Sequence, residues 1–313
     1  IISGPMKVAV IGGTGFVGRY IVSALIEAGH SVALLVRPGS AGKLQCPDAV
    51  QVTVGDVGSA TAIAKTLEGC DAVIYCIGIL RESRRNGVTF EALQYEGVVR
   101  TVEAAINAGV KRFLLMSANG IKSPGTPYQD TKKRAEDVVL ASGLDATVFR
   151  PSVIFGDPLG AMEIATQLYR QMVRPPIPAA GFYTGWRPAE GQILMSPIHV
   201  EDVAAAFVSA LGNDDTIGRV FALGGPEEVS WTGMIRRIAE AVGRTKWVLP
   251  YPIWLIRIGA ALFDWLPFFP ATRDQLTMLA EGNTADPKIV EQLIGRPPRA
   301  FDAASLGYLD TGQ

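Results

Sequence analysis

Tyr128 and Lys132 lie one helical turn apart in the segment PYQDTK, where they bring a phenol and an ammonium group together. The segment follows a Pro-Gly-Thr-Pro loop, so we expect a helix to begin at Pro127 and to carry both side chains on one face. An ammonium group beside a phenol favours the phenolate and lowers the pKa of the phenol. A lone Tyr-x-x-x-Lys spacing also arises by chance, so the pair gains meaning only from the elements around it.

A glycine-rich turn near the N-terminus supplies part of that context. The stretch 11–18 reads IGGTGFVG and lies between a β-branched run and an amphipathic segment. Glycines at positions 12, 15 and 18 allow a tight turn, close approach of the backbone to a pyrophosphate, and close packing of a helix on a strand. The turn therefore predicts dinucleotide binding. The expected contacts are Gly12, Thr14, Gly15, Phe16, Val17 and Gly18.

The end of the second expected strand indicates which dinucleotide binds. An acidic residue there would accept a hydrogen bond from the adenosine ribose 2′-hydroxyl, but no acid occurs between Glu27 and Asp48. Arg37 follows the strand instead. Its guanidinium can form two hydrogen bonds to a 2′-phosphate, with Ser40 and Lys43 as further contacts. The sequence thus favours NADP(H) as cofactor, with NAD(H) as the alternative.

Short β-branched runs alternate with amphipathic segments up to Arg150, as is typical of a parallel sheet with helices on both faces. The expected strands are Lys7–Gly12, Ser31–Val36, Val50–Val54, Ala72–Ile77, Arg112–Ser117 and Ala146–Arg150. The expected helices are about Phe16–Ala28, Ser59–Leu67, Thr89–Asn107 and Pro127–Ala141, and the glycines expected to cap them are Gly29, Gly69, Gly109 and Gly143. The predicted fold class is α/β, a doubly wound parallel sheet (Rossmann fold) with a smaller C-terminal substrate-side region.

The domain organisation follows from where this alternation loosens. Residues 1–5, before Met6, resemble an expression scar. We expect residues 6–156 to form the dinucleotide-binding core and residues 157–313 to form a mixed region that holds the smaller substrate-binding subdomain. A strand ending at His199 and the helix after it suggest that part of this region, about 192–223, returns to the sheet.

These motifs together resemble the extended and atypical short-chain dehydrogenases/reductases over most of residues 6–223. The resemblance includes Gly55-Asp56-Val57 after the third strand and the stretch 150–156 (RPSVIFG). Within that superfamily the chain looks most like the subgroup of the nucleotide-binding accessory subunit of mitochondrial complex I and its bacterial relatives. That likeness rests on the stretch 116–120 (MSANG) and on the tail stretch 272–276 (TRDQL).

The resemblance implies roles for the opening pair. Tyr128 would act as the general acid/base and Lys132 as its support, which also hydrogen-bonds the nicotinamide ribose. A serine or threonine after the fifth strand would donate to the substrate oxygen. Ser117 is the nearest candidate, and Thr126 or Asn119 are alternative donors.

The resemblance implies further cofactor contacts along the carboxyl ends of the strands. Asp56 and Val57 would contact the adenine, and the segment Cys76-Ile77-Gly78 lies where the cofactor ribose is expected, with a glycine that permits close approach. The Cys76 side chain itself fits a packed core residue better than a nucleophile. The stretch 150–156 adds Pro151, Ser152 and Val153, and the structural asparagine of the family is replaced near Gln94.

Composition and charge exclude several classes of function. The chain has 313 residues and a formal net charge of −1, which gives no general attraction for nucleic acid. Three cysteines without a C-x-x-C pair, and only two histidines, make a disulfide framework and a metal cage improbable and favour a cytoplasmic location. The apolar stretch 247–270 is interrupted by charges and prolines, so we expect no membrane-spanning segment there. Core packing is its leading explanation, with a lipid-like substrate pocket, a protein partner or a membrane surface as alternatives.

Two functions remain open from the sequence. The first is an NADP(H)-dependent oxidoreductase or epimerase that acts on a small-molecule substrate. The second is a non-catalytic accessory protein that keeps NADP(H) as a structural or redox-sensing ligand. The Tyr128–Lys132 pair favours the first, and the displaced serine favours the second.

Overall fold

The computed structural model describes residues 4–40, 42, 47–188, 191–254 and 273–310. The chain divides into two compact units. The first comprises Ile1–Pro151, Val200–Ala222 and Glu291–Arg296, and the second comprises Ser152–His199, Leu223–Val290 and Pro297–Gln313. Within the described residues, no helix is both long and apolar enough to cross a bilayer.

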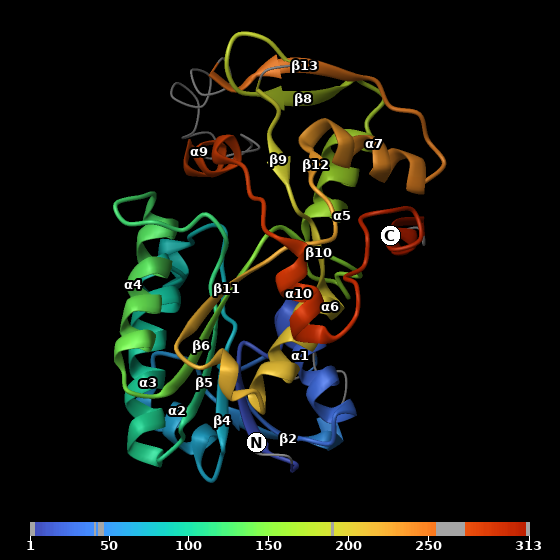
Figure 1. The fold of residues 1–313 in the computed structure, drawn as a ribbon. Coiled ribbons are helices and arrows are strands. Elements are labelled where there is room, and N and C mark those ends of the chain that lie inside the picture. Colours follow the sequence, from blue (N-terminus) through green and yellow to red (C-terminus); the bar gives the residue numbers. More distant parts are fainter. Residues whose placement is uncertain (1–3, 41, 43–46, 189–190, 255–272, 311–313) are drawn as a thin grey trace. The chain divides into compact units, whose positions relative to one another are not determined.

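The first unit is built on a seven-stranded parallel sheet (Figure 1). Its strand order is β11-β6-β5-β4-β1-β2-β3. The strands are β1 (Lys7–Ile11), β2 (Ser31–Val36), β3 (Val50–Val54), β4 (Ala72–Tyr75), β5 (Arg112–Met116), β6 (Asp145–Pro151) and β11 (Arg219–Leu223). The central strands are apolar on both faces, as parallel strands covered by helices must be. The predicted α/β class with a doubly wound sheet is confirmed.

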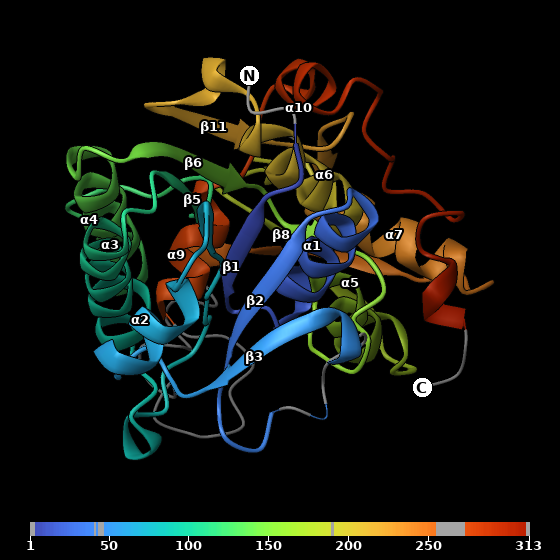
Figure 2. The same ribbon diagram turned by 90° about the horizontal axis from the view of Figure 1, so that it is seen from below.

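Helices cover both faces of this sheet (Figure 2). One face carries α1 (Phe16–Glu27) and α6 (Val200–Leu211), which pack against each other. The other carries α2 (Ala60–Leu67), α3 (Gly97–Ala108) and α4 (Pro127–Ala141). The glycines predicted to end four helices all have a positive φ, from +67° at Gly69 to +82° at Gly29, which only glycine adopts without strain.

The helix expected over Thr89–Asn107 is interrupted. Residues Glu91–Glu96 form a π-helical turn (η4), and α3 follows from Gly97. A methyl group on Gly97 would lie 2.4 Å from the Tyr75 hydroxyl, so only glycine fits where α3 begins against β4. π-Helical turns often occur at functional sites.

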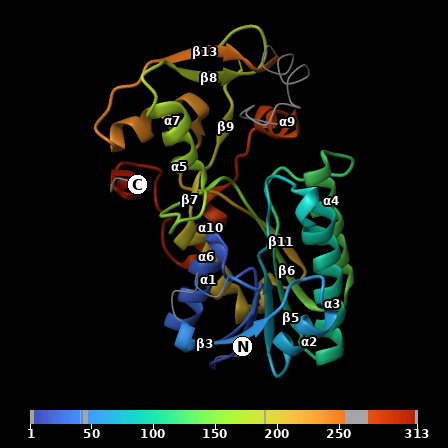
Figure 3. The same cartoon turned by 180° about the vertical axis from the view of Figure 1, so that it is seen from behind.

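The second unit consists of short elements around its own core (Figure 3). Three strand pairs are β7 (Ile154–Phe155) with β10 (Ile198–His199), β8 (Ala179–Tyr183) with β13 (Val248–Pro252), and β9 (Leu194–Met195) with β12 (Val229–Ser230). The helices are α5 (Ile164–Leu168), α7 (Trp231–Ala241) and α9 (Arg273–Glu281), and α10 (Pro287–Ile294) spans the boundary of the units. Short helical turns are η2 (Pro47–Ala49), η3 (Arg84–Asn86), η5 (Tyr169–Val173), η6 (Asp214–Thr216) and η7 (Gly307–Asp310).

Candidate functional site

The glycine turn between β1 and α1 is closed by its own backbone. The Gly15 amide donates to the Gly12 carbonyl at 3.0 Å, and Gly12 itself has a φ of +103°. A methyl group on Gly18 would lie 2.1 Å from that same carbonyl oxygen. Gly12 and Gly18 are therefore needed for the chain to fold back on itself here, and a methyl group on Gly15 would lie 3.3 Å from the same oxygen.

The start of α1 leaves amide groups available to an anion. Gly15 is the N-cap residue, so no side chain caps the helix, and its first turn contains no acidic residue. The N-terminus of a helix attracts phosphate through such amide groups and through the helix dipole. Thr14 and Phe16 remain partly exposed beside the turn, whereas Val17 packs into the core.

Arg37 and Ser40 form a tight turn at the end of β2. The Ser40 amide donates to the Arg37 carbonyl at 2.9 Å, and Gly39 between them has a φ of +79°. Arg37 is exposed and Ser40 is buried. Lys43 lies outside the described residues. The strand that leads into this turn, β2, is separated from β4 by β1.

Asp56 and Val57 follow β3. An oxygen of the exposed Asp56 carboxylate accepts a hydrogen bond from the Gly58 amide at 2.8 Å and so shapes the turn. The Val57 side chain is buried in the core of the first unit. A nucleotide would therefore meet the carboxylate of Asp56 and the backbone of Val57.

The segment after β4 is held against the glycine turn and against α4. The Cys76 thiol donates to the Ile11 carbonyl at 3.4 Å, and its burial raises the pKa to about 12. Cys76 is therefore a packed thiol, as predicted. The Ile77 carbonyl accepts a hydrogen bond from Lys132 at 3.2 Å, and a methyl group on Gly78 would lie 3.9 Å from the Lys132 Nζ atom.

The helix α4 begins where the sequence predicts. Thr126 and Gln129 form a reciprocal capping box, and Pro127 occupies the first helical turn. This start places Tyr128 and Lys132 four residues apart on one helix face. These neighbouring residues thus fix the start of α4, and no contact with a cofactor is needed to form it.

Lys132 is buried at the carboxyl ends of two neighbouring strands. Only 3% of the residue is exposed, and its Nζ atom donates to the Ile77 carbonyl and, at 3.0 Å, to the Met116 carbonyl. Burial lowers the pKa of the ammonium group to about 8, against the opposing influence of Cys76 and Glu136. The Glu136 carboxylate is itself fully buried and paired with Arg150. The two hydrogen bonds therefore fix the ammonium group in place, and its burial away from water costs free energy.

Tyr128 is half-buried, and its ring meets the ring of Phe90 edge to face with centroids 5.7 Å apart. Protein atoms around the phenol raise its pKa to about 12. The cause is desolvation, so the expected lowering of this pKa by Lys132 is not seen; the Lys132 ammonium group donates to two carbonyl oxygens instead. Phe90, which packs against the Tyr128 ring, is a residue of the site that the sequence did not indicate.

Ser117 follows β5 and lies next to the Met116 carbonyl that holds Lys132. The residue is 4% exposed, its amide donates to the Phe149 carbonyl at 2.7 Å, and its hydroxyl has no hydrogen-bond partner among the described atoms. The alternative donors are held by bonds that they accept, since the Thr126 hydroxyl oxygen accepts from the Gln129 amide and the Asn119 side-chain oxygen accepts from the Gly120 amide. An unpartnered buried hydroxyl makes Ser117 the residue best suited to receive a ligand atom.

Gln94, at the place of the family's asparagine, lies in the π-helical turn and is 1% exposed. Its amide nitrogen donates to the Ile79 carbonyl at 2.9 Å, and its oxygen accepts from the Thr131 hydroxyl at 3.3 Å. It therefore ties the segment after β4 to the residue beside Lys132. A hydrogen-bonding side chain is kept here although its type has changed.

The segment after β6 contributes the last group of predicted contacts. The Pro151 carbonyl accepts from the Asn119 amide at 3.0 Å. Ser152 begins the second unit, where its hydroxyl donates to the Asn283 carbonyl at 2.7 Å, and Val153 is partly buried. The structure thus links Lys132 to the segment 76–78 and to the residue before Ser117, with Tyr128 on the same helix face, and leaves Ser152 occupied within the second unit.

Comparisons with known proteins show the family of this chain. A family model described as NAD(P)H-binding matches residues 12–180, more than half of the chain. The ceramide reductase of Caulobacter vibrioides is 28% identical over 263 residues, which cover 82% of this chain and 77% of that protein. The UDP-glucose 4-epimerase of Vibrio cholerae is 24% identical, with 83% of each chain covered.

The accessory subunit of complex I also appears among the relatives. The mouse NADH dehydrogenase [ubiquinone] 1 alpha subcomplex subunit 9 is 27% identical, which covers 85% of this chain and 70% of that protein. It is one of several distant relatives, so the likeness to this subgroup is not specific. Among solved structures, the crystal structure of gox2253 matches 97% of this chain and 96% of that one, with a TM-score of 0.76 and 22% identity, and so shows the same fold.

Proposed function

Because the chain belongs to the NAD(P)H-binding family, we propose that it is an NADP(H)-dependent oxidoreductase or epimerase in which Tyr128 is the acid/base. The observation that carries this proposal is the buried Lys132 ammonium group, which donates to the carbonyls of Ile77, after β4, and Met116, at the end of β5. Met116 is followed by Ser117, whose hydroxyl has no hydrogen-bond partner among the described atoms. A cation kept in such a place at the cost of desolvation is typical of a functional site.

The residues around the sheet edge fit a dinucleotide. The glycine turn and the open N-terminus of α1 would hold the pyrophosphate, and Asp56 and Val57 would lie along the adenosine. The 2′-phosphate would be held by the exposed Arg37 guanidinium and the Ser40 hydroxyl, with Lys43 as a further cation. Lys132 would hydrogen-bond the nicotinamide ribose. The remaining contacts would come from Cys76, Ile77, Gly78, Pro151, Ser152 and Val153.

The nicotinamide, when bound, supplies or accepts a hydride. A phenol with a pKa of about 12 is protonated at neutral pH, so Tyr128 stands ready to donate its proton to an oxygen that gains negative charge. Ser117 would donate a second hydrogen bond to that oxygen from its buried hydroxyl. Lys132 would stabilise the phenolate that remains, and this stabilisation requires the protonated form of the lysine.

Arg37 provides the test of cofactor choice. A charge-assisted pair of hydrogen bonds to phosphate contributes about 1.5–3 kcal/mol, which is roughly ten- to a hundredfold in affinity. Titration calorimetry should therefore show tighter binding of NADPH than of NADH, and Arg37→Ala should remove the preference. Arg236→Ala, which removes an exposed arginine of the second unit, should leave it unchanged. Equal affinity of the wild-type protein for both nucleotides would overturn the assignment of Arg37.

A non-catalytic accessory protein that keeps NADP(H) as a structural or redox-sensing ligand is the second candidate. It is favoured by the relationship to the complex I subunit. The two functions are separated by NADPH oxidation measured with a panel of carbonyl compounds and nucleotide sugars. Turnover that depends on Ser117 supports the enzyme. Tight NADPH binding with no turnover of any substrate in the panel supports the accessory protein.

A further inference from the structure

The second unit contains a two-stranded ribbon that is covered on one face. Strands β8 and β13 pair in parallel from Val248 opposite Ala179 to Pro252 opposite Tyr183. The helix α7 packs against both strands (Figure 3). Trp231 of this helix donates its indole N–H to the Ala180 carbonyl at 3.1 Å and stacks on Phe182. The ribbon is therefore anchored to the core of its own unit.

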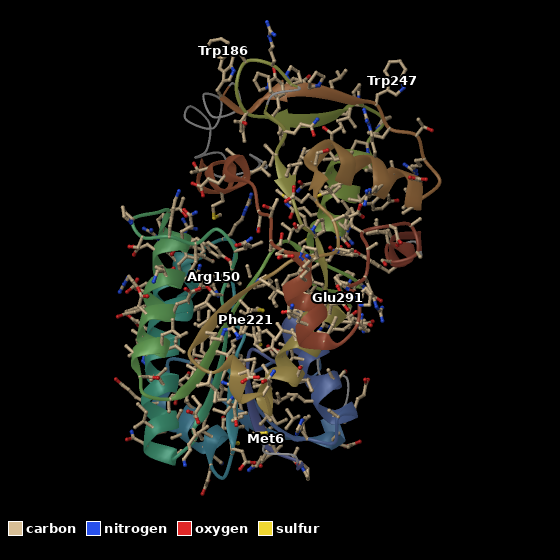
Figure 4. All side chains as sticks on the ribbon, viewed as in Figure 1. Met6, Arg150, Trp186, Phe221, Trp247 and Glu291 are labelled. Carbon is tan, nitrogen blue, oxygen red and sulfur yellow. The ribbon has the colours of Figure 1, made fainter. Side chains whose placement is uncertain are left out.

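Large apolar side chains lie exposed along the ribbon and at its ends. We call this set the aromatic patch, and it comprises Trp186, Trp247, Leu249, Tyr251 and Trp254. Trp186 is 91% exposed and Trp247 is 76% exposed, and the other three are each more than 40% exposed. Figure 4 shows Trp186 and Trp247 on the side of the ribbon that faces away from α7. Tryptophan is usually well buried, so three exposed ones within one unit indicate a surface that is covered in use.

The two stretches of chain that hold the aromatic patch contain basic residues and no acid. No acid occurs between Glu163 and Glu190, nor between Glu240 and Asp264, although the whole chain has a net charge of −1. The cations of these two stretches within the described residues are Arg170, Arg174, Arg187, Arg244 and Lys246.

Two of these cations are fixed in place. Arg244 donates to the Arg174 carbonyl at 3.3 Å, and Lys246 donates to the carbonyls of Val173 and Pro175. Arg244 and Lys246 also line a hollow at the surface together with Arg236 and Glu240. These basic groups place positive charge at the end of the ribbon where Trp247 lies.

From this combination we infer that the aromatic patch docks on the surface of an anionic phospholipid bilayer. Tryptophan and tyrosine are the residues enriched at the interface between water and lipid, where an apolar ring and a polar N–H or O–H group are both satisfied. Arginine and lysine beside them are attracted by acidic headgroups. A second copy of the chain would present the same basic residues, so like charges would face each other and it is the poorer partner. The inference does not depend on the proposed catalytic function.

The inference is tested with the full-length protein and two kinds of vesicle. Co-sedimentation should show binding to vesicles of phosphatidylcholine with 30% phosphatidylglycerol, and much weaker binding to pure phosphatidylcholine. Each basic residue near an acidic surface contributes about fivefold to the affinity. The double variant Arg174→Glu, Arg187→Glu should therefore lose at least about tenfold, whereas Lys65→Glu, Lys111→Glu in the first unit should bind as the wild type apart from a small effect of net charge.

The contribution of the exposed tryptophans to vesicle binding is tested with a second set of matched variants. Trp186→Ala with Trp247→Ala should lower the affinity about tenfold or more. Val54→Ala with Leu80→Ala removes two side chains of the first unit, each 65% exposed, and should leave binding unchanged. Thermal unfolding of every variant verifies that it is folded. Absence of binding to the acidic vesicles, or equal losses in patch and control variants, would overturn the inference. So would an oligomer in sedimentation velocity that is dissociated by the tryptophan variants while vesicle binding is absent.

Discussion

Lys132 should make the free energy of unfolding of this protein rise with pH above about pH 8, a range in which most proteins gain no stability. Its ammonium group is buried, and the pKa falls from an ordinary 10.5 to about 8 in the folded chain. The unfolded chain therefore binds more protons between about pH 8 and 10.5, so the free energy of unfolding increases with pH through that window. Below pH 8 the folded protein carries the full cost of the buried charge.

The magnitude follows from the two pKa values. The cost at pH 7 is about 3 kcal/mol, and integration of the proton binding from pH 7 to pH 9.5 recovers about 2 kcal/mol of it. In Lys132→Met no ammonium group is present, so this gain disappears. The carbonyls of Ile77 and Met116 lose their donor in the variant, but that loss does not change with pH and shifts the whole curve equally.

Urea unfolding of the cofactor-free protein at several values between pH 7 and pH 9.5 measures the effect. The free energy of unfolding of the wild type relative to Lys132→Met should rise by about 2 kcal/mol over that range. Lys133→Met is the matched control, because Lys133 is more exposed and pairs with Asp137 on the surface of α4. The free energy of unfolding of Lys133→Met, plotted against pH, should run parallel to that of the wild type. Parallel curves for Lys132→Met and the wild type would refute the placement of a charged lysine in this site.

Two further substitutions test the site. Gly18→Ala would place a methyl group 2.1 Å from the Gly12 carbonyl oxygen, so both the Tm and the NADPH affinity should fall, the affinity by about tenfold or more; an unchanged affinity in calorimetry would contradict the role of the turn. Ser117→Ala removes a buried hydroxyl that has no partner among the described atoms, so urea unfolding should detect no loss of stability, while turnover should fall about ten- to a hundredfold at unchanged NADPH affinity. A loss of stability without loss of turnover would make Ser117 a structural residue.

Local signals were sufficient to predict the first unit. The glycine turn, the capping glycines and the capping box around Thr126 each lie within a few residues of the element they shape, so the sequence shows them directly. For the same reason the Tyr128–Lys132 pair could be placed on one helix face without a structure. The strand order was not predicted and comes from the structure.

Other features depend on residues distant in the sequence. The raised pKa of Tyr128 arises from burial beside Phe90, which lies 38 positions away and gives no signal near the tyrosine. The strands β7, β9, β10 and β12 contain two residues each, too few for a periodic pattern. β13 contains Pro250 and Pro252, which argue against a strand, yet it pairs with β8 at the edge of a two-stranded ribbon. Part of the apolar stretch 247–270, from 255 onward, lies outside the described residues.

Turnover by Tyr128→Phe tests the central claim most directly. The variant removes only the hydroxyl and keeps the ring that packs against Phe90. With a substrate that the wild type reduces, and with NADPH saturating, the rate of NADPH oxidation should fall about 10²–10⁴-fold while the NADPH affinity stays unchanged. A variant that turns over as fast as the wild type would contradict the account, because the Tyr128 hydroxyl would then not be the proton donor.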